Sequence, residues 1–255
     1  MLLAIDIGNS NIAFGIYENG WKQHWRLNTV ADKTSDEYEV LFRSLISNGH
    51  GSLENVKQVV ISSVVPPLSP TFKHMVQRMF GTAPLMVNAT MDTGIEVTID
   101  NPVEIGSDLL ANAVAGYAKY QDKCIVVDFG TALSITIVGE GGKLLGGSIA
   151  PGLKSAMKAL SSNTAQLPFV QLEAPPSAIG KNTIHAIQSG VVLGYVGLVE
   201  SLIKRIKAEL GEAAKVIATG GLAEVIAPHT KQFDAIDPWL TLDGLRLIAQ
   251  RNVSA

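Results

Sequence analysis

Short apolar runs alternate with segments of helical periodicity along most of the chain. Apolar runs bounded by turn residues, such as residues 2–5 and 56–65, predict buried β-strands. Segments in which apolar residues recur every three or four positions predict helices, for example over residues 37–47 and 71–80. Because strand and helix alternate in this way, the pattern indicates an α/β fold.

The rest of the pattern extends this series of elements. Asn19-Gly20 is a strong hairpin turn between two strands. Further strands are expected at residues 12–17, 21–27, 84–87, 124–138 (a strand–turn–strand unit), 143–149 and 216–218, and further helices at residues 106–119, 152–160, 182–210 (continuous or broken) and 221–228. Residues 168–176, with a proline at each end, have the composition most typical of a loop.

One short motif occurs twice, near the start of the chain and near its middle. Asp6-Ile-Gly-Asn and Asp128-Phe-Gly-Thr each follow an apolar strand and precede a returning apolar strand. The two copies lie about half a chain length apart. This repeat predicts two similar halves, residues 1–117 and 118–255, each beginning with the same hairpin.

The repeated hairpin is suited to binding phosphates. A carboxylate at the carboxyl end of a strand faces the crevice in which α/β sheets bind ligands. A glycine two residues later allows a tight turn whose backbone N–H groups can approach an anion. Asn, Ser or Thr adds side-chain donors for phosphate oxygens. Two such hairpins therefore favour a nucleotide-binding site with cations, although a single Asp-x-Gly is more often only a turn.

The composition excludes several classes of function. Hydrophobic residues make up 47% and charged residues 17% of the chain, and the net charge is −3. These values argue against a disordered chain, and the lack of a basic run argues against nucleic acid or a membrane surface as a partner. Cys124 is the one cysteine and lies in an apolar run, so we expect a core residue. With no signal peptide and no uninterrupted apolar run of membrane-spanning length, a cytoplasmic globular protein is expected.

With these motifs the sequence resembles one family over almost its whole length. It is similar to the type III pantothenate kinases, within the superfamily of acetate and sugar kinases and actin. The matching segments, in chain order, are Asp6-Ile-Gly-Asn-Ser-Asn, Ser63-Val-Val-Pro, Asp100-Asn-Pro, Ile105-Gly-Ser-Asp, Asn112-Ala-Val-Ala, Asp128-Phe-Gly-Thr-Ala, Gly146-Gly-Ser-Ile-Ala-Pro-Gly-Leu, Thr164-Ala-Gln-Leu-Pro, Asn182-Thr183, Thr219-Gly-Gly and Leu240-Thr-Leu-Asp-Gly-Leu.

The resemblance implies both a fold and an activity. The implied fold is two duplicated ribonuclease H-like domains, the actin-like ATPase fold, with the active site in the cleft between them. The implied activity is ATP-dependent phosphorylation of pantothenate to 4'-phosphopantothenate, the first step of coenzyme A biosynthesis. The resemblance further implies a homodimer that needs Mg²⁺ and a monovalent cation, K⁺ or NH₄⁺.

The resemblance also assigns roles to individual residues. Asp108 matches the catalytic proton acceptor, for which a plain helix N-cap, worth about 1 kcal/mol, is the alternative role. Asp128 matches the monovalent-cation ligand. The residues implied to bind ATP are Asp6, Ile7, Gly8, Asn9, Ser10, Asn11, Ile12, Ala13 and Thr131, with Asp6 near Mg²⁺ through water. The residues implied to bind pantothenate are Gly106, Ser107, Asp108, Leu109 and Thr183.

The chain departs from the family's usual residues near the substrate. Leu109 stands where the family usually has Arg, and Ile99 stands where many members have Tyr. An Arg would suit pantothenate's carboxylate, so its loss bears on substrate binding. Two alternatives to a working pantothenate kinase therefore stay open. One is a catalytically impaired nucleotide-binding accessory or regulatory protein on the same fold, and the other is a kinase for a different small hydroxylated substrate.

Overall fold

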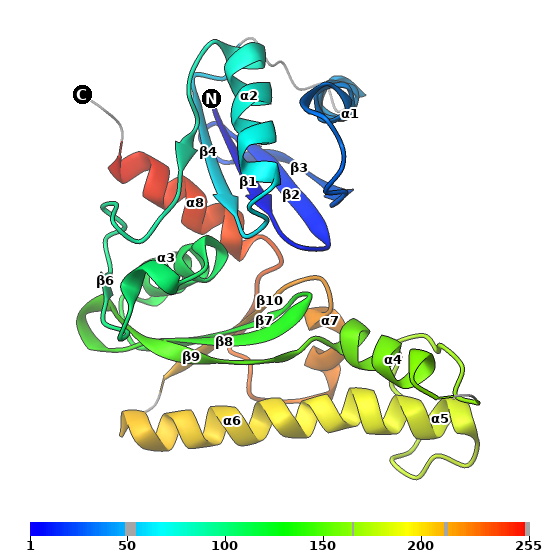
Figure 1. Ribbon diagram of the computed structural model, residues 1–255. Helices are drawn as coiled ribbons and strands as arrows, with labels where there is room; N and C mark the ends of the chain where they lie inside the picture. The colour runs from blue at the N-terminus through cyan, green and yellow to red at the C-terminus, as the bar shows by residue number, and fades with distance from the viewer. Residues whose placement is uncertain (49–54, 165, 212–213, 253–255) are drawn as a thin grey trace. The chain divides into compact units, whose positions relative to one another are not determined.

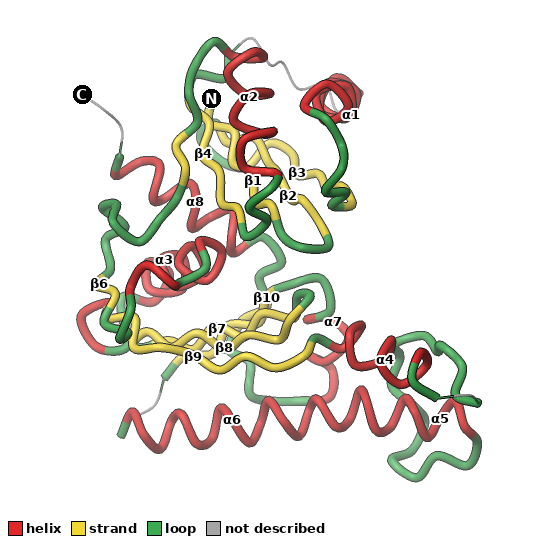
Figure 2. Tube along the Cα trace, viewed as in Figure 1, coloured by secondary structure: helices red, strands yellow, loops and turns green. Residues whose placement is uncertain are grey.

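The computed structural model describes residues 1–48, 55–164, 166–211 and 214–252 (Figure 1). The chain forms two compact units, one of Met1–Ala115 with Leu240–Ala255 and one of Gly116–Trp239. Each unit has its own β-sheet and its own hydrophobic core, and strands alternate with helices in both (Figure 2). The predicted α/β class is therefore confirmed.

The sheet of the first unit has five strands in the order β3-β2-β1-β4-β5. The central strand β1 is antiparallel to β2 and parallel to β4. Of the outer strands, β3 is antiparallel to β2 and β5 is parallel to β4. The strands are β1 (Leu2–Ile7), β2 (Asn11–Tyr17), β3 (Trp21–Asn28), β4 (Gln58–Ser63) and β5 (Leu85–Met86).

The sheet of the second unit repeats this arrangement. The sheet has six strands, and the five that this unit contributes follow the order β11-β10-β7-β8-β9, with β7 antiparallel to β8 and parallel to β10. The outer strand β9 is antiparallel to β8, and β11 is parallel to β10. The strands are β7 (Cys124–Phe129), β8 (Ala132–Val138), β9 (Lys143–Pro151), β10 (Lys215–Thr219) and β11 (Ala235–Ile236). The matching orders and directions confirm the two similar halves that the repeated Asp-x-Gly motif predicts.

Helices connect the strands in both halves. The remaining elements before β7 are α1 (Ser35–Asn48), α2 (Leu68–Phe80), the short strand β6 (Glu96–Val97), the 3₁₀ turn η1 (Pro102–Glu104) and α3 (Ser107–Tyr120). Those after β8 are η2 (Glu140–Gly142), α4 (Leu153–Ser162), α5 (Thr183–Gln188), the π-turn η3 (Ser189–Leu193), α6 (Gly194–Leu210), α7 (Ala223–Ile226), η4 (Ala227–His229) and α8 (Leu240–Arg251). The sequence pattern predicts most of the strands and helices, but not β6, β11, α8 or the short 3₁₀ turns η1 and η2.

Stacked aromatic rings form much of the core of the first unit. The rings of Phe14 on β2 and Phe42 on α1 lie 4.0 Å apart, and Trp25 on β3 lies 5.2 Å from Phe14. Phe72 on α2 completes the cluster at 4.8 Å from the ring of Tyr38. Because these rings come from two strands and two helices, their burial fixes α1 and α2 on one face of the sheet.

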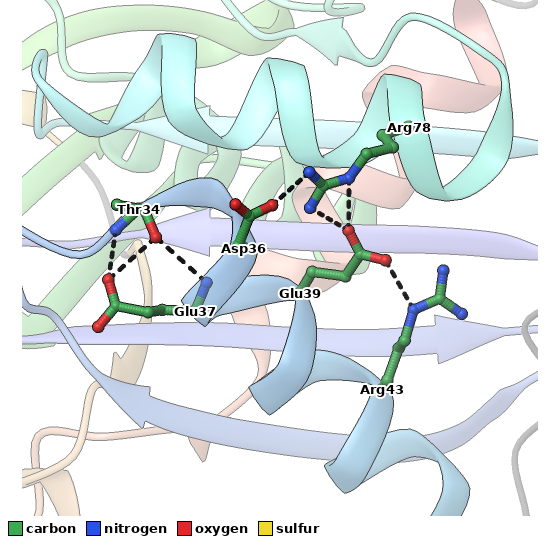
Figure 3. A network of polar contacts seen from close by, with 6 residues as sticks. All are labelled: Thr34, Asp36, Glu37, Glu39, Arg43 and Arg78. Carbon is green, nitrogen blue, oxygen red and sulfur yellow. Dashed lines mark hydrogen bonds and ion pairs between the residues drawn. The ribbon is translucent and has the colours of Figure 1, made fainter.

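Polar contacts at the start of α1 and along α2 add to this packing (Figure 3). Thr34 forms a capping box with Glu37: its Oγ1 accepts the Glu37 N–H at 3.3 Å, and Glu37 Oε2 accepts the Thr34 N–H at 2.8 Å. Arg78 of α2 pairs with Asp36 and Glu39 of α1. Exposed ion pairs of this kind contribute about 0–1 kcal/mol each, so the aromatic core dominates the packing of α1 with α2.

The longest helical segment, Thr183–Leu210, runs as one helix that contains a π-turn at Ser189–Leu193. The helix predicted over residues 182–210 is therefore confirmed, in its continuous form. By length and composition this segment is the one helix in the described chain that could cross a membrane. Its apolar stripe packs into the core of the second unit through Ile187, Val191, Val192, Val196, Val199 and Ile203.

Cys124 is the first residue of β7 and is fully buried. Burial raises the pKa of its thiol to about 12, so the sulfur is protonated at neutral pH. A β-carbon added at Gly116 of α3 would lie 3.0 Å from this sulfur, so the thiol is in close contact with the helix. The predicted core role of Cys124 is confirmed.

The last helix, α8, packs against β1, β2 and β4 of the first sheet. It crosses α3 closely at Gly244, where an added β-carbon would overlap the carbonyl oxygen of Ala111. Beside this crossing, Thr241 Oγ1 donates to Asn112 Oδ1 at 2.8 Å, which satisfies a fully buried amide. The sequence assigns residues 240–255 to the second half, whereas the compact units group this helix with the first half. The domain boundary near residue 117 stays a prediction.

Replacing Gly244 by Ala should destabilise the protein by about 1–3 kcal/mol, because the added methyl group overpacks the crossing of α3 and α8. The free energy of unfolding in urea measures this change. Gln250→Ala, on the exposed side of the same helix, is the matched control and should stay within about 0.5 kcal/mol of the wild type. A Gly244→Ala protein as stable as the wild type would contradict the close approach of the two helices.

Candidate active site

The first Asp-x-Gly hairpin joins β1 to β2. Asp6 is the fifth of six residues in β1, and its neighbours across the sheet are Ala13 on β2 and Ser62 on β4. Residues in register on adjacent strands point to the same face, so Asp6 and Ser62 share one face of the sheet. One carboxylate oxygen of Asp6 is buried. This arrangement holds an acid at the carboxyl end of the central strand.

The turn of this hairpin is held by its own backbone and by the end of β3. The Gly8 N–H donates to Asn11 O at 3.0 Å, and Thr29 Oγ1 donates to Gly8 O at 2.6 Å. The Thr29 N–H also donates to Ser10 O at 3.0 Å. Asn9, Ser10 and Asn11 are exposed. The polar tip of the turn is thus fixed in place with its side chains open to solvent.

Two of the predicted ATP-binding residues have side chains that face away from solvent. Ile7 and Ile12 are fully buried and belong to the core of the first unit. Their side chains anchor the two strands on either side of the turn. Any contact that Ile7 and Ile12 make with a nucleotide would therefore use their backbone groups.

The second hairpin joins β7 to β8 and has the same plan. Asp128 is the fifth of six residues in β7, and its neighbours across the sheet are Ser134 on β8 and Thr219 on β10. Both neighbours are buried hydroxyl residues, so polar groups surround the Asp128 carboxylate. Gly220 lies against it at a φ of +89°, and an added β-carbon there would overlap Asp128 Oδ1. Position 220 of the Thr-Gly-Gly turn therefore requires glycine, because it packs directly on this acid at a positive φ.

The turn after Asp128 is supported by the start of α4. The carbonyl oxygen of Thr131 accepts the Gly152 N–H at 3.2 Å and the Ser155 hydroxyl at 3.0 Å. A β-carbon added at Gly152 would overlap that oxygen. The side chain of Thr131 is exposed. A fixed backbone with an open hydroxyl is suited to donating a hydrogen bond to a ligand oxygen.

The predicted substrate stretch lies at the start of α3. Gly106 precedes the helix, and its carbonyl oxygen accepts the Leu110 N–H at 3.0 Å. Asp108 Oδ1 accepts the Leu109 N–H at 2.8 Å, and the carboxylate lies 2.5 Å from where a β-carbon at Gly106 would be. Burial raises the pKa of Asp108 above its usual range, against the opposing effect of the backbone N–H bonds. Asp108 is therefore a half-buried acid inside the first turn, and Gly106 occupies the cap position.

Thr183, the remaining predicted substrate residue, is the first residue of α5 and is exposed. The cap of this helix is Asn182, whose Oδ1 accepts the His185 N–H at 2.8 Å. Within the first unit the structure thus places Asp6 and Ser62 side by side and links β4 to the start of α3. Within the second unit it places Asp128 beside Gly220 and Thr219.

The sequence analysis does not single out Ser62. This residue has no local pattern, because it acts on a residue distant in the sequence. Among the residues that the structure describes, no group of three or more His, Cys, Asp or Glu side chains could hold a metal ion by itself. A cation here would need oxygen ligands from a bound substrate or from water as well.

Comparison with known proteins identifies the family. The profile of the type III pantothenate kinases matches residues 2–205. A type III pantothenate kinase of an Exiguobacterium species is 46% identical over 253 residues, which cover 99% of each chain. One from a Roseiflexus species is 46% identical over 255 residues, which cover both chains completely. The chain belongs to the type III pantothenate kinase family.

Solved structures agree with this family in fold. A crystal structure described as a putative Baf family transcriptional activator from Campylobacter jejuni has a TM-score of 0.62 at 22% identity, with 98% of each chain covered. The activator of 2-hydroxyisocaproyl-CoA dehydratase from Clostridium difficile, solved with bound ADPNP, has a TM-score of 0.56 at 14% identity, with 100% of this chain and 98% of that chain covered. These likenesses confirm the duplicated actin-like ATPase fold.

Replacing Asp108 by Asn should stabilise the folded protein at neutral pH. A carboxyl whose pKa is raised on folding binds its proton more tightly in the native state, so its ionisation lowers stability as the pH rises past its unfolded pKa. The melting temperature of Asp108→Asn should therefore exceed that of the wild type at pH 7, by a margin that shrinks towards pH 4. Asp32→Asn, at an exposed position, is the control and should show no such margin.

Proposed function

We propose that this protein is a cytoplasmic pantothenate kinase that transfers the γ-phosphoryl group of ATP to pantothenate, giving 4'-phosphopantothenate and ADP in the first step of coenzyme A biosynthesis. The observation that carries the proposal is the 46% identity over the full chain to relatives named type III pantothenate kinase. The acids Asp6, Asp108 and Asp128 support the proposal. The fold holds each of them at a place where a carboxylate can bind a cation or accept a proton.

Asp108 is the proposed catalytic base. The attacking hydroxyl of pantothenate must lose its proton as the bond to phosphorus forms, and a positioned carboxylate can accept that proton. Partial burial favours this role, since it raises the pKa of Asp108 and makes the carboxylate a better proton acceptor than an exposed one. The bond from the Leu109 N–H to Oδ1 holds one oxygen of the carboxylate in place, and Oδ2 is the proposed proton acceptor.

The two hairpins are the proposed binding elements for the phosphates of ATP. In the first, the turn at Gly8 brings the exposed Asn9, Ser10 and Asn11 and their backbone N–H groups to one place, as phosphate binding requires. In the second, the exposed hydroxyl of Thr131 is a further donor. Backbone donors suit this task because they bind phosphate oxygens without any side-chain charge.

The donor atoms beside each hairpin fit the two cations that the family implies. Mg²⁺ keeps several waters and binds through one or two carboxylates and the substrate phosphates, so Asp6 alone is sufficient, with water between. When bound, Mg²⁺ would neutralise charge on the phosphates. Asp128 is the proposed ligand of the monovalent cation, and its oxygen-rich surroundings at Ser134 and Thr219 suit K⁺ or NH₄⁺.

The central test is a coupled assay for ADP with ATP, Mg²⁺ and K⁺, with and without pantothenate. The wild type should release ADP only with pantothenate, and omission of either cation should lower the rate. Asp108→Asn should reduce kcat by about 10²- to 10⁴-fold while ATP binding, measured by calorimetry, is retained. Asp32→Asn should behave as the wild type.

The same assay separates the alternatives. ATP binding by the wild type without turnover of pantothenate would contradict the kinase and favour a nucleotide-binding accessory protein. Turnover with another small alcohol from a panel, but not with pantothenate, would contradict the substrate while keeping the reaction type.

The proposed pantothenate-binding residues are Gly106, Ser107, Asp108, Leu109 and Thr183. Leu109 supplies no charge to the substrate's carboxylate, so Leu109→Arg should lower KM for pantothenate about tenfold. The reason is that a charge-assisted hydrogen bond is worth about 1.5–3 kcal/mol. KM for pantothenol, which has an alcohol in place of the carboxylate, should stay unchanged. An equal effect on both acceptors would contradict a direct contact with the carboxylate.

The proposed assembly is a homodimer, and one face of the long helix supports it. Gly190, Gly194 and Gly197 lie on this face, and within the described chain an added β-carbon at any of them would meet no atom within 4 Å. Each glycine inside a helix costs about 1 kcal/mol relative to alanine, so their presence has no explanation within the single chain. Ile184 and Ile179 nearby in sequence are 50% and 78% exposed. Small residues of this kind allow a second helix to approach closely.

Light scattering on a sizing column should give twice the 27.0 kDa mass of one chain. Gly194→Arg should shift the mass towards that of the monomer, because the long side chain blocks close approach to this face. Ala31→Arg, at an exposed position of the first unit, should leave the dimer intact. A dimer unaffected by Gly194→Arg would place the interface elsewhere.

A further inference from the structure

Two buried hydroxyl groups, bonded to each other, join the end of β4 to the start of α3. Ser62 is fully buried and Ser107 is 8% exposed, and their hydroxyl oxygens lie 2.9 Å apart. Ser107 Oγ also accepts the N–H of Ser63 at 3.0 Å. Ser69 Oγ of α2 donates to Ser63 Oγ at 3.0 Å. Four serines from three elements are thus joined by hydrogen bonds at the point where β4 ends.

At the last residue of β4, the Ser63 N–H is bonded to the hydroxyl of Ser107 and not to a carbonyl oxygen of a neighbouring strand. The Ser63 N–H comes at the last residue of β4, where the next N–H, that of Val64, still donates to Ile7 O of β1 at 3.1 Å. A buried N–H without an acceptor costs about 1–3 kcal/mol. The hydroxyl of Ser107 supplies that acceptor, so the first turn of α3 is tied to the strand beside β1.

This tie connects the two acids of the first unit. Ser62 is in register with Asp6 on the neighbouring strand, on the same face of the sheet. Ser107 directly precedes Asp108, whose carboxylate is held over Gly106 and bonded to the Leu109 N–H. The carboxylate therefore has little freedom within its own turn. Its position relative to Asp6 depends on where the whole turn sits, which the hydroxyl bonds of Ser107 fix.

We propose that Ser107 is a positioning residue, which, together with Ser62, holds the first turn of α3 so that the Asp108 carboxylate keeps its place relative to Asp6. This inference deepens the proposed function and rests on it for the role of Asp108. Ser107 acts through its hydroxyl and its contacts with β4. Because Ser62 Oγ and the Ser63 N–H both meet it, a residue without a hydroxyl at position 107 leaves two polar groups without their partner.

Four variants test the proposal. Ser107→Ala removes both bonds, Ser107→Thr keeps a hydroxyl, and Ser62→Ala removes one bond while the Ser63 N–H stays satisfied. Ser161→Ala is the control, because its exposed hydroxyl donates to Lys158 O within α4 of the other unit. For each variant, kcat and KM for ATP are measured, together with the pKa of the Asp108 carboxyl by carbon-13 NMR. Asp108→Asn assigns the resonance.

Ser107→Ala should lower kcat about 10- to 100-fold, as a displacement of about 1 Å in a reacting group does, with KM for ATP within about twofold of the wild type. Its Asp108 pKa should fall towards the usual value for aspartate, because a loosened turn admits water to the carboxylate. Ser107→Thr should restore both values, and Ser62→Ala should lie between. Ser161→Ala should match the wild type.

Wild-type values of kcat and of the Asp108 pKa in Ser107→Ala would overturn the proposal. A lower kcat together with an unchanged Asp108 pKa would also overturn the proposal if Ser107→Thr did not restore kcat. That pattern indicates only a packing defect. If Ser107→Ala does not fold, Ser62→Ala decides by the same two readouts. Failure of the proposed function is recognised separately: the wild type then turns over no pantothenate, while the NMR titrations still report whether Ser107 holds the turn.

Discussion

The structure depends on the burial of its two central strands. In both β1 and β7 every residue but one is buried, and the exception is the aspartate at the fifth position. A charge cannot be taken from water without compensation, so such a strand can carry an acid only near its carboxyl end, where the sheet opens to solvent. In each half the carboxylate is accompanied by a hairpin turn and by a buried hydroxyl residue on the neighbouring parallel strand, Ser62 or Thr219, and in the second half Gly220 packs directly on it.

The same conflict between burial and charge recurs at Asp108. Its carboxylate lies at a helix N-terminus, where the backbone N–H groups favour its ionised form, yet burial opposes ionisation and has the larger effect. Because its pKa is raised, Asp108 is a stronger base than an exposed aspartate. For the same reason its ionisation lowers the stability of the fold. This loss of stability is confined to the start of α3, because the aromatic core around Phe14 and Phe42 is separate from that helix.

Local patterns were sufficient to predict most strands of both sheets, most of the helices and the two acidic hairpins. Apolar periodicity marks such elements, and Asp-x-Gly marks a turn whose geometry is set by three adjacent residues. Contacts between distant residues had no such signal. The bond between Ser62 and Ser107 spans 45 positions, and α8 reaches its place beside β1 only through tertiary packing. The two-residue strand β11 is too short for any periodicity. Prolines and Asp-x-Gly therefore reveal turns, whereas the bonds from Ser62 and Ser63 to Ser107 at the start of α3 are found only in the three-dimensional structure.

The buried thiol of Cys124 has a practical consequence. A sulfur that stays protonated and is enclosed by β7 and α3 reacts slowly with maleimides and oxidants, since both require an exposed thiolate. The native chain thus behaves as a cysteine-free background for site-specific labelling. Cysteines introduced at the exposed tips of the two hairpins, at Asn9 and Thr131, would carry a pair of spectroscopic probes without removal of the natural residue. The separation of the two hairpins could then be followed as nucleotide binds and leaves.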